Sequence, residues 1–439
     1  MLLTINIIVF FILTVMGFYF LAVRRVFSVK GPINKQEKFI VNNHQYLLLF
    51  FLATAILACG SMMANRLMIC VLICFLSLFF INKGFKFSVV WILYLIYLLY
   101  LIISLIQSPV TNYGFRQFLK YLYPFLLMIF ASRIPTSGVF YLKAIKVVLA
   151  VALLGSIWLI LQHVPLINRI AFFFDSLLFW GPAVVDFLPV GVVIALSLYS
   201  VSKEKKYLAY SALFILPSIL WAWRTGILAS SIAIVVFSLV RYKLKSVPYV
   251  IVGCFVLVGS VLFIPSIRTK MFMEQMSADE VLERRGELSV DDINSSARFA
   301  MWEWSLDNYY KGNELFGSGL GILQYAFYER DDNPYTDESR RGSQHNDYVQ
   351  ILCDTGLVGL ILYLLVFISL IAHSFFVYFN RRSVAIVKLA ALISGAAMAG
   401  MVSTLYTDNV VTYSMMTLSY PFALYGLMLG LKNNYRNAV

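Results

Sequence analysis

Long apolar stretches separated by short polar links run along almost the whole chain. A membrane-spanning α-helix needs about 20 consecutive, mainly apolar residues to cross about 30 Å of hydrocarbon, and thirteen stretches are candidates. They are expected at residues 4–23, 46–60, 65–81, 87–106, 115–132, 139–162, 183–201, 205–223, 225–241, 247–265, 347–380, 384–405 and 411–431. Strands of a membrane β-barrel alternate apolar and polar residues, which these stretches do not do. The pattern predicts an all-α polytopic membrane protein with about 12–13 transmembrane helices.

Two of these stretches depart from the usual length. The stretch at 46–60 is short for a complete crossing, whereas the stretch at 347–380 is longer than one crossing needs. We therefore expect part of 347–380 to extend beyond the bilayer or to lie tilted in it.

Composition and charge agree with a membrane protein and give its orientation. Hydrophobic residues make up 61% of the chain and charged residues only 13%, against about 25% charged in soluble domains. With thirteen spans and an outside N-terminus, all six basic clusters fall on the cytoplasmic side, as the positive-inside rule requires. The net charge of +13 is thus a consequence of membrane orientation, and we expect no nucleic-acid partner. The clusters lie at residues 24–38, 83–86, 203–206, 241–245, 381–382 and 432–436.

One long hydrophilic segment, residues 265–345, is placed outside by the same orientation. It contains 15 of the 22 acidic residues but only 9 of the 35 basic residues. The chain is therefore expected to have three regions: N-terminal transmembrane helices at 1–264, an outer loop domain at 265–345, and C-terminal transmembrane helices at 346–439.

Several motifs argue against a nucleotide or a metal. All five cysteines lie in apolar segments, without metal-ligand spacing to histidine. The stretch GSGLG at Gly317–Gly321 has no strand–turn–helix unit around it, and we interpret it as a tight turn that lets the backbone approach another group. The acidic stretch with Asp331, Asp332, Asp337 and Glu338 is interpreted as solvated charge. We expect no metal and no cofactor.

Cationic side chains on the outer side are unexpected under the positive-inside rule and therefore need an explanation. Arg224 stands between two apolar stretches, and Arg298 precedes two tryptophans. Arg116 and Lys120, four residues apart, share a helix face. These residues either form a cationic pocket for an anionic substrate, or reach lipid headgroups and loop carboxylates. Arginine suits a phosphate because its planar fork donates two hydrogen bonds.

His345 opens the long apolar stretch at 347–380, next to Asn346 and Asp347. A neutral imidazole can take a proton from a hydroxyl group near neutral pH, so His345 is a candidate general base. Asn346 or Asp347 can cap the following helix. The alternative is that the histidine itself is only a cap or a headgroup contact.

Taken together, these motifs resemble the O-antigen ligase/polymerase family of membrane glycosyltransferases. The stretches SARFAMWEW, FGSGLG and HNDYVQILCDTGLVGL are similar to the family's Arg-xxx-Trp element, Gly-x-Gly turn and His-Asn before a Gly-xx-Gly helix. WRTGILAS resembles the hairpin that precedes the loop. The resemblance covers about residues 220–365, and Asp354 stands where the family often has glutamate.

The resemblance implies transfer of a glycan from an undecaprenyl-diphosphate-linked donor to an acceptor hydroxyl, with inversion and without metal or nucleotide. It implies a bacterial inner-membrane protein with its site at the periplasmic face. The partners it implies are the lipid-linked glycan, an acceptor glycan or lipid A core, membrane lipids and other polysaccharide assembly proteins. The residues expected to act are His345 as the base, Arg224 and Arg298 on the diphosphate, Arg116 and Lys120 in weaker support, and Trp302, Gly319 and Asn346 as supporting residues.

Two activities of the family remain open, and so does one function of another class. A polymerase passes the glycan to another lipid-linked repeat unit, and a ligase passes it to the lipid A core; we expect a polymerase. A transporter or flippase for a lipid-linked glycan would need charged residues through both halves of the membrane. The predicted spans are poor in charge, with Asp186 as the main exception, which argues against transport.

The predicted orientation can be tested by labelling single cysteines with an impermeant thiol reagent. Cysteines at Ser277 and Thr336 should react in intact spheroplasts because both positions are predicted to lie outside. Cysteines at Ser28 and Ser202 should react only after lysis. Labelling at Ser28 before lysis would overturn the outside N-terminus.

Overall fold

The computed structural model describes residues 44–53, 88–164, 181–248, 250–251, 296–329, 345–413 and 415–436, and within these residues it contains helices and no strand. The helices are α5 (Val89–Gln107), α6 (Thr111–Arg133), α7 (Gly138–Leu161), α9 (Gly181–Ser202), α10 (Lys205–Leu220), α11 (Arg224–Tyr242), η2 (Lys243–Ser246), α15 (Ser296–Tyr309), α16 (Ile322–Glu329), α17 (Asp347–Phe379), α18 (Ala385–Thr407), α19 (Val410–Tyr413) and α20 (Met415–Arg436).

The structure confirms the all-α membrane architecture. Six described helices are long and apolar enough to span a bilayer, namely α5, α7, α9, α11 with η2, α17 and α18. Helices α6, α10 and α20 also coincide with predicted spans. Of the remaining predictions, 4–23 and 65–81 lie outside the described residues, and 46–60 and 247–265 are described only in part. The predicted outer loop is described over 296–329 and at His345, and the division into three regions stays a prediction.

Two boundaries differ from the prediction. The segment expected at 205–223 ends at Leu220, so that Trp221–Trp223 form a turn before α11. The segment expected at 411–431 is divided into the short α19 and the long α20.

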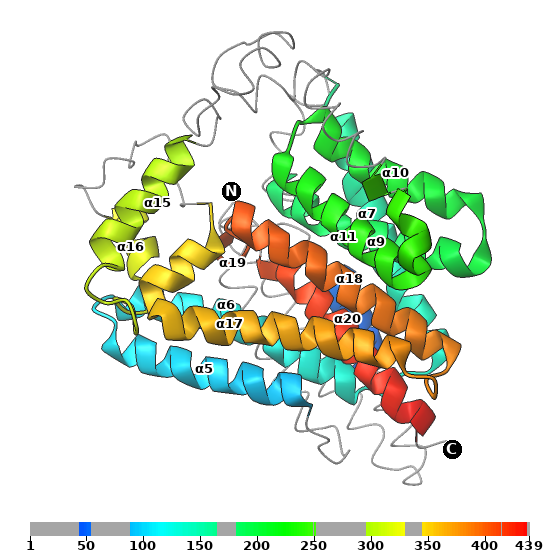
Figure 1. Ribbon diagram of the computed structural model, residues 1–439, viewed down its shortest axis with the longest axis horizontal. Helices are drawn as coiled ribbons and strands as arrows, with labels where there is room; N and C mark the ends of the chain where they lie inside the picture. The colour runs from blue at the N-terminus through cyan, green and yellow to red at the C-terminus, as the bar shows by residue number, and fades with distance from the viewer. Residues whose placement is uncertain are drawn as a thin grey trace, which may run out of the picture.

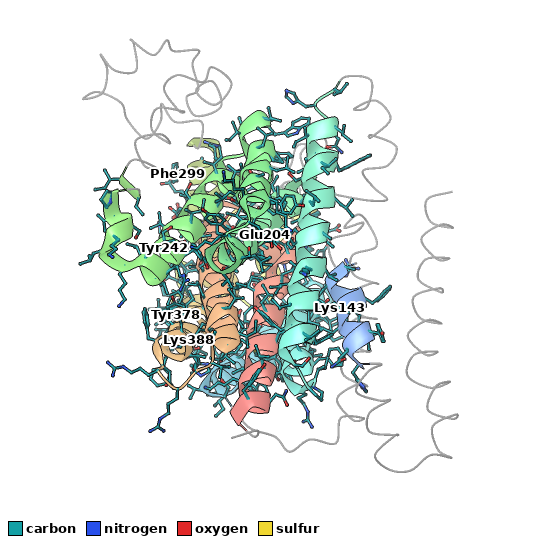
Figure 2. All side chains as sticks on the ribbon, turned by 90° about the vertical axis from the view of Figure 1, so that its right-hand side faces the viewer. Lys143, Glu204, Tyr242, Phe299, Tyr378 and Lys388 are labelled. Atoms are coloured by element: carbon teal, nitrogen blue, oxygen red, sulfur yellow. The ribbon has the colours of Figure 1, made fainter. Side chains whose placement is uncertain are left out.

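The centre of the molecule is formed by α9, α18 and α20. Helix α18 contacts α9, α11, α17 and α20, and α20 also packs along α6. Helices α5, α7, α11 and α17 surround this centre and leave more of their apolar surface exposed. Figure 1 shows α15 and α16 together at one end of the bundle, beside the start of α17. Figure 2 places Tyr378 and Lys388, at the adjoining ends of α17 and α18, away from Phe299 of α15.

Helix α17 is broken at Gly356. This residue has φ 66° and ψ −170°, a region of the Ramachandran map that is essentially restricted to glycine. Residues 347–355 therefore form one segment and residues 357–379 a second, and Figure 1 shows the two running at an angle. The break accounts for the excess length predicted for 347–380, because only the second segment has the length of one crossing.

The loop 314–319 supplies the hydrogen bonds that the break removes. The amides of Leu357 and Val358 donate to the carbonyls of Glu314 and Leu315, at 2.8 and 3.2 Å. On the other side of the break, the amides of Ser318 and Gly319 donate to the carbonyls of Cys353 and Asp354, at 2.9 and 3.0 Å. Irregular backbone at membrane depth is tolerated only where its polar groups are satisfied in this way.

The Gly-rich stretch is the close-approach turn that its sequence predicts. Gly317, Gly319 and Gly321 all have positive φ. A Cβ on Gly317 would meet the backbone of Asp354–Gly356. The Asp354 carboxylate then accepts the amides of Gly321 and Leu323, each at 3.0 Å, and so caps the start of α16. One loop thus joins the break in α17 to α15 on one side and to α16 on the other.

Substitution of Gly356 by alanine should lower the stability of the end of the bundle that contains α15 and α16. The conformation at Gly356 costs a residue with a Cβ about 1–3 kcal/mol, and that Cβ would also meet the backbone of Leu315 and Phe316. Thermal unfolding of the detergent-solubilised protein measures the loss.

The matched control for this substitution is Gly312→Ala. Gly312 also has positive φ, at 87°, but a Cβ there meets nothing within 4 Å. Gly312→Ala should therefore lower the stability only by the free energy that a positive φ costs a residue with a Cβ. Equal losses from the two substitutions would contradict the tight approach of the loop to Gly356.

Candidate functional site

The link between α18 and α20 is the meeting point of the predicted site residues. It consists of Thr407, Asp408, Asn409 and the short helix α19. This link receives contacts from α15, from the start of α17 and from α6, which are far apart in the sequence. We call the residues Thr407–Tyr413 the α18–α20 link.

His345 pairs with an aspartate of this link. Its Nδ1 lies 2.9 Å from Oδ1 of Asp408, and the His345 side chain keeps 35% of its surface exposed while Asp408 keeps 11%. An ionised carboxylate can only accept, so the pairing places the imidazole proton on Nδ1 and leaves the lone pair on Nε2. The backbone of His345 has φ 52°, a left-handed conformation that is uncommon outside glycine. The imidazole is therefore held by both its backbone and its partner.

Neighbouring residues dock the start of α17 onto the same link. The Asn346 side chain accepts the amides of Tyr348 and Val349, which confirms the predicted helix cap. The Asn346 amide donates to Oδ1 of Asn409 at 2.9 Å, and the Asp347 carboxylate accepts the Val411 amide at 3.0 Å. These short polar contacts fix the position of His345 relative to Asp408.

Arg298 and Trp302 reach the end of α18 from α15. Arg298 donates from Nη1 to the Thr407 carbonyl at 2.7 Å, and the Trp302 ring meets the Tyr406 ring edge-on at 5.8 Å. The four-residue spacing puts both side chains on one helix face, and this explains the Arg-xxx-Trp pattern. Burial lowers the pKa of the Arg298 guanidinium, while the Asp408 carboxylate acts in the opposite direction. Arginine nevertheless keeps its charge at neutral pH.

Arg224 is the first residue of α11 and is held near Arg298. The turn before it contains Ala222 at φ 49° and the stacked rings of Trp221 and Trp223, with centroids 5.6 Å apart. Trp221 also donates from Nε1 to the Leu159 carbonyl at 2.9 Å. Arg224 interacts electrostatically with Arg298, and Arg298 interacts electrostatically with Asp408. The tight hairpin predicted at Arg224 is present.

Lys120 and Arg116 have different surroundings from those expected of a substrate-binding pair. Lys120 is buried on α6, donates from Nζ to the Thr412 carbonyl at 2.8 Å and lies within electrostatic range of Asp347. Arg116 is exposed, with its guanidinium 5.6 Å from the centroid of the Tyr113 ring. In this structure Lys120 binds the α18–α20 link, whereas Arg116 lies one helical turn closer to the start of α6.

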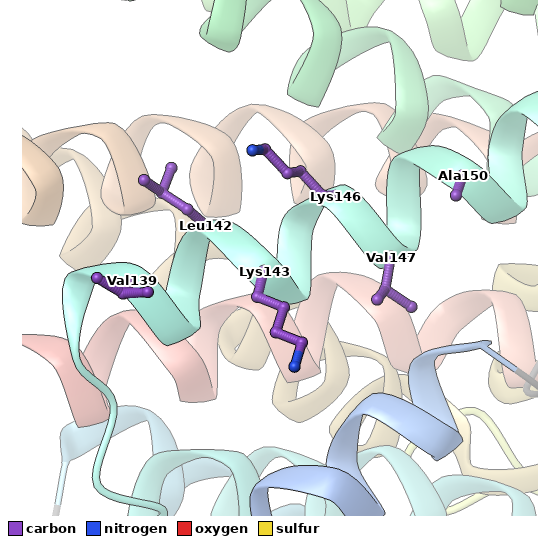
Figure 3. A pocket seen from close by; sticks show the side chains of 6 residues that line it. All are labelled: Val139, Leu142, Lys143, Lys146, Val147 and Ala150. Atoms are coloured by element: carbon purple, nitrogen blue, oxygen red, sulfur yellow. The ribbon is translucent and has the colours of Figure 1, made fainter.

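Gly319 belongs to the break in α17 rather than to the charged cluster. Its positive φ of 109° and its contact with Ser108 serve the loop that fills the break. A shallow hollow of about 450 Å³ elsewhere on the molecule does not coincide with the cluster either. Figure 3 shows it along α7, and it is lined by Val139, Leu142, Lys143, Lys146, Val147 and Ala150.

Sequence reasoning missed Asp408, Asn409 and Gln350. Asn409 donates from Nδ2 to Oε1 of Gln350 at 3.0 Å, and Thr412 donates to the same oxygen at 2.8 Å. One signal was available, because Asp408 is an acidic residue outside 265–345 and stands between two apolar stretches. The pairing with His345 depends on a contact across 63 positions, which no local pattern reveals.

The cluster combines an imidazole, a carboxylate paired with it and two guanidinium groups at one end of the bundle. Such a set can remove a proton from a hydroxyl group while it neutralises a developing negative charge. Within the described residues, no three His, Cys, Asp or Glu side chains are arranged to hold a metal ion. The acidic stretch 331–338 lies outside the described residues.

Comparison with protein families matches residues 209–364 to a family described as O-antigen ligase. This segment includes Arg224, Arg298, Trp302, Gly319 and His345, and it ends before Asp408. The resemblance inferred from the motifs is thus confirmed over this part of the chain. No curated protein matches the chain in sequence.

The role of Lys120 can be separated from substrate binding by its effect on stability. Lys120→Met should cost about 1–3 kcal/mol of unfolding free energy, because the Thr412 carbonyl loses its buried donor and Asp347 loses a cationic neighbour. Arg116→Gln, four residues away and exposed, should change stability by less than about 0.5 kcal/mol. Unfolding of both variants in detergent measures the difference. If Lys120→Met keeps its stability and only weakens donor binding, the structural role is wrong.

Proposed function

Because residues 209–364 place the chain in the O-antigen ligase/polymerase family, whose members are glycosyltransferase-type enzymes, we propose that it transfers a glycan from a polyprenyl-diphosphate donor to an acceptor hydroxyl. The observation that carries the proposal is the His345–Asp408 pair, 2.9 Å apart, beside Arg298 and Arg224. The donor is undecaprenyl-diphosphate-linked, and the site faces the periplasm of a bacterial inner membrane.

His345 is the general base in this mechanism. Its Nε2 takes the proton of the acceptor hydroxyl, and the acceptor oxygen forms a bond to the anomeric carbon. The bond from that carbon to the diphosphate oxygen breaks, and its electron pair stays on the leaving diphosphate. A single displacement of this kind inverts the anomeric configuration. Asp408 keeps the imidazole in the required tautomer and stabilises the imidazolium ion that forms.

Arg298 and Arg224 bind the diphosphate and stabilise the charge that it gains. Arg224 begins α11, whose first turn contains no acidic residue and whose cap residue Trp223 offers no side-chain acceptor. The positive end of the helix dipole therefore adds to the guanidinium charge, an arrangement that favours phosphate. Arginines in this position supply the stabilisation without a metal ion. Trp302 and Asn346 support the site by fixing α15 and the start of α17.

For the acceptor we propose a second lipid-linked glycan, which makes the protein a polymerase. A ligase would use the same residues with lipid A core as the acceptor. Since both reactions need only a hydroxyl next to His345 Nε2, the acceptor is decided by the assay below.

The test uses the full chain in liposomes with undecaprenyl-diphosphate-linked repeat units and EDTA. Chain growth should occur without ATP, nucleotide sugar or metal, because the diphosphate already activates the donor. His345→Ala should lower the transfer rate by about 10²–10⁴-fold while donor binding is retained, since a general base contributes that factor. Asp408→Asn should lower kcat as well, and Arg298→Lys should weaken donor binding because lysine lacks the bidentate fork.

Two controls accompany these variants. His373→Ala, near the other end of α17, and Arg382→Lys, in the exposed α17–α18 link, should keep transfer. Near-normal transfer by His345→Ala would contradict the role of the base, and activity that requires a divalent cation would contradict the metal-free mechanism. Growth only after addition of lipid A core would make the protein a ligase. Movement of the glycan across the bilayer without transfer would make it a transporter.

A further inference from the structure

Two large apolar side chains are exposed at the tip of the loop that fills the break in α17. Leu315 is 58% exposed and Phe316 is 60% exposed. Neither side chain joins the main hydrophobic core or the smaller core between α15, α16 and the first segment of α17. Adjacent exposed leucine and phenylalanine residues outside a core indicate a contact surface for an apolar partner.

The backbone of this tip is rigidly attached to the beginning of the second segment of α17. The carbonyls of Glu314 and Leu315 accept the amides of Leu357 and Val358. A Cβ on Gly356 would collide with the backbone of Leu315 and Phe316. The tip therefore keeps a fixed position relative to the second segment of α17.

The second segment of α17 begins at the outer boundary of the hydrocarbon, so the attached tip lies at this boundary. Residues 357–379 span about 34 Å at about 1.5 Å per residue. A bilayer has about 30 Å of hydrocarbon, so a helix of this length begins near its surface. Leu357 is 41% exposed and Ile361, one turn further, is 47% exposed, as expected for residues that face lipid. The tip continues this lipid-facing surface outward.

The rest of the turn is polar, which gives the loop two sides. Asp307 and Lys311 form an exposed ion pair, and the Glu314 carboxylate accepts the Gly312 amide. A polar base with an apolar end is the pattern of a segment that lies in the membrane interface.

From these observations we propose that Leu315 and Phe316 insert into the outer leaflet of the bilayer and contact the acyl chains of its phospholipids. The insertion anchors the turn that directly follows α15, the helix that carries Arg298. The outer unit of α15 and α16 is thereby held at the membrane surface by a contact of its own, in addition to its packing on α17.

Photo-crosslinking with p-benzoylphenylalanine tests this proposal in the full chain. The amino acid replaces Phe316 in protein reconstituted into vesicles of radiolabelled phosphatidylethanolamine and phosphatidylglycerol. Because it resembles phenylalanine, it should leave the fold unchanged. Irradiation should attach several-fold more labelled lipid at position 316 than at position 311, where Lys311 lies on the polar side of the same turn. Ile368, 59% exposed in the middle of the second segment, provides the positive control.

The contrary outcomes are distinct. Lipid labelling at position 316 no higher than at position 311, with normal labelling at 368, would overturn the proposal. A crosslink from position 316 to a second copy of the chain would also overturn it, because the partner would then be protein. If the variant at 316 does not accumulate, the same comparison at Leu315 decides the question by the same criterion.

Discussion

The arrangement of the site depends on the break in α17 at Gly356 and on the loop that fills it. A helix that stops at membrane depth leaves carbonyl and amide groups that must be satisfied inside the protein. Here the loop 314–319 satisfies both sides of the break, accepting from Leu357 and Val358 and donating to Cys353 and Asp354. Because the first segment of α17 is thereby free to turn away from the second, His345 at its start can reach the α18–α20 link. An unbroken α17 would carry His345 along the axis of the long segment.

The same loop connects the two halves of the candidate site. It follows α15 in the chain, so the position of Arg298 is coupled to the position of Gly356, while His345 lies ten residues before Thr355, the last residue of the first segment. Both halves then close on the α18–α20 link, where Thr407 accepts from Arg298 and Asp408 pairs with His345. Residues of the loop region and of the C-terminal helices thus form one site, although the family match ends at residue 364.

The predictions from sequence succeeded where the physical cause is local. Apolar length located the long described helices outside 265–345, the four-residue spacing of Arg298 and Trp302 put them on one face, and Asn346 capped α17 as its side chain allows. The glycines at 317–321 indicated a close backbone approach without revealing its partner. The buried position of Lys120 was not predicted, because only tertiary packing shows that its ammonium group donates to the Thr412 carbonyl. Asp408 was missed for the same reason.

In the proposed function, the two arginines of the candidate site bind an anion, the diphosphate of the donor. Arg224 and Arg298 are close enough to repel one another, and Arg224 adds its charge to the positive end of α11. Asp408 offsets one of these charges but is also engaged with His345 and with the Asn409 amide. Two partly buried guanidinium groups close to one another repel, and in the proposed function a bound diphosphate relieves that repulsion. Since the leaving diphosphate carries more negative charge than the bonded one, the relief grows as the glycosidic bond breaks. In the proposed mechanism the same two arginines therefore contribute more to the transition state than to binding of the donor, which is the condition for rate acceleration.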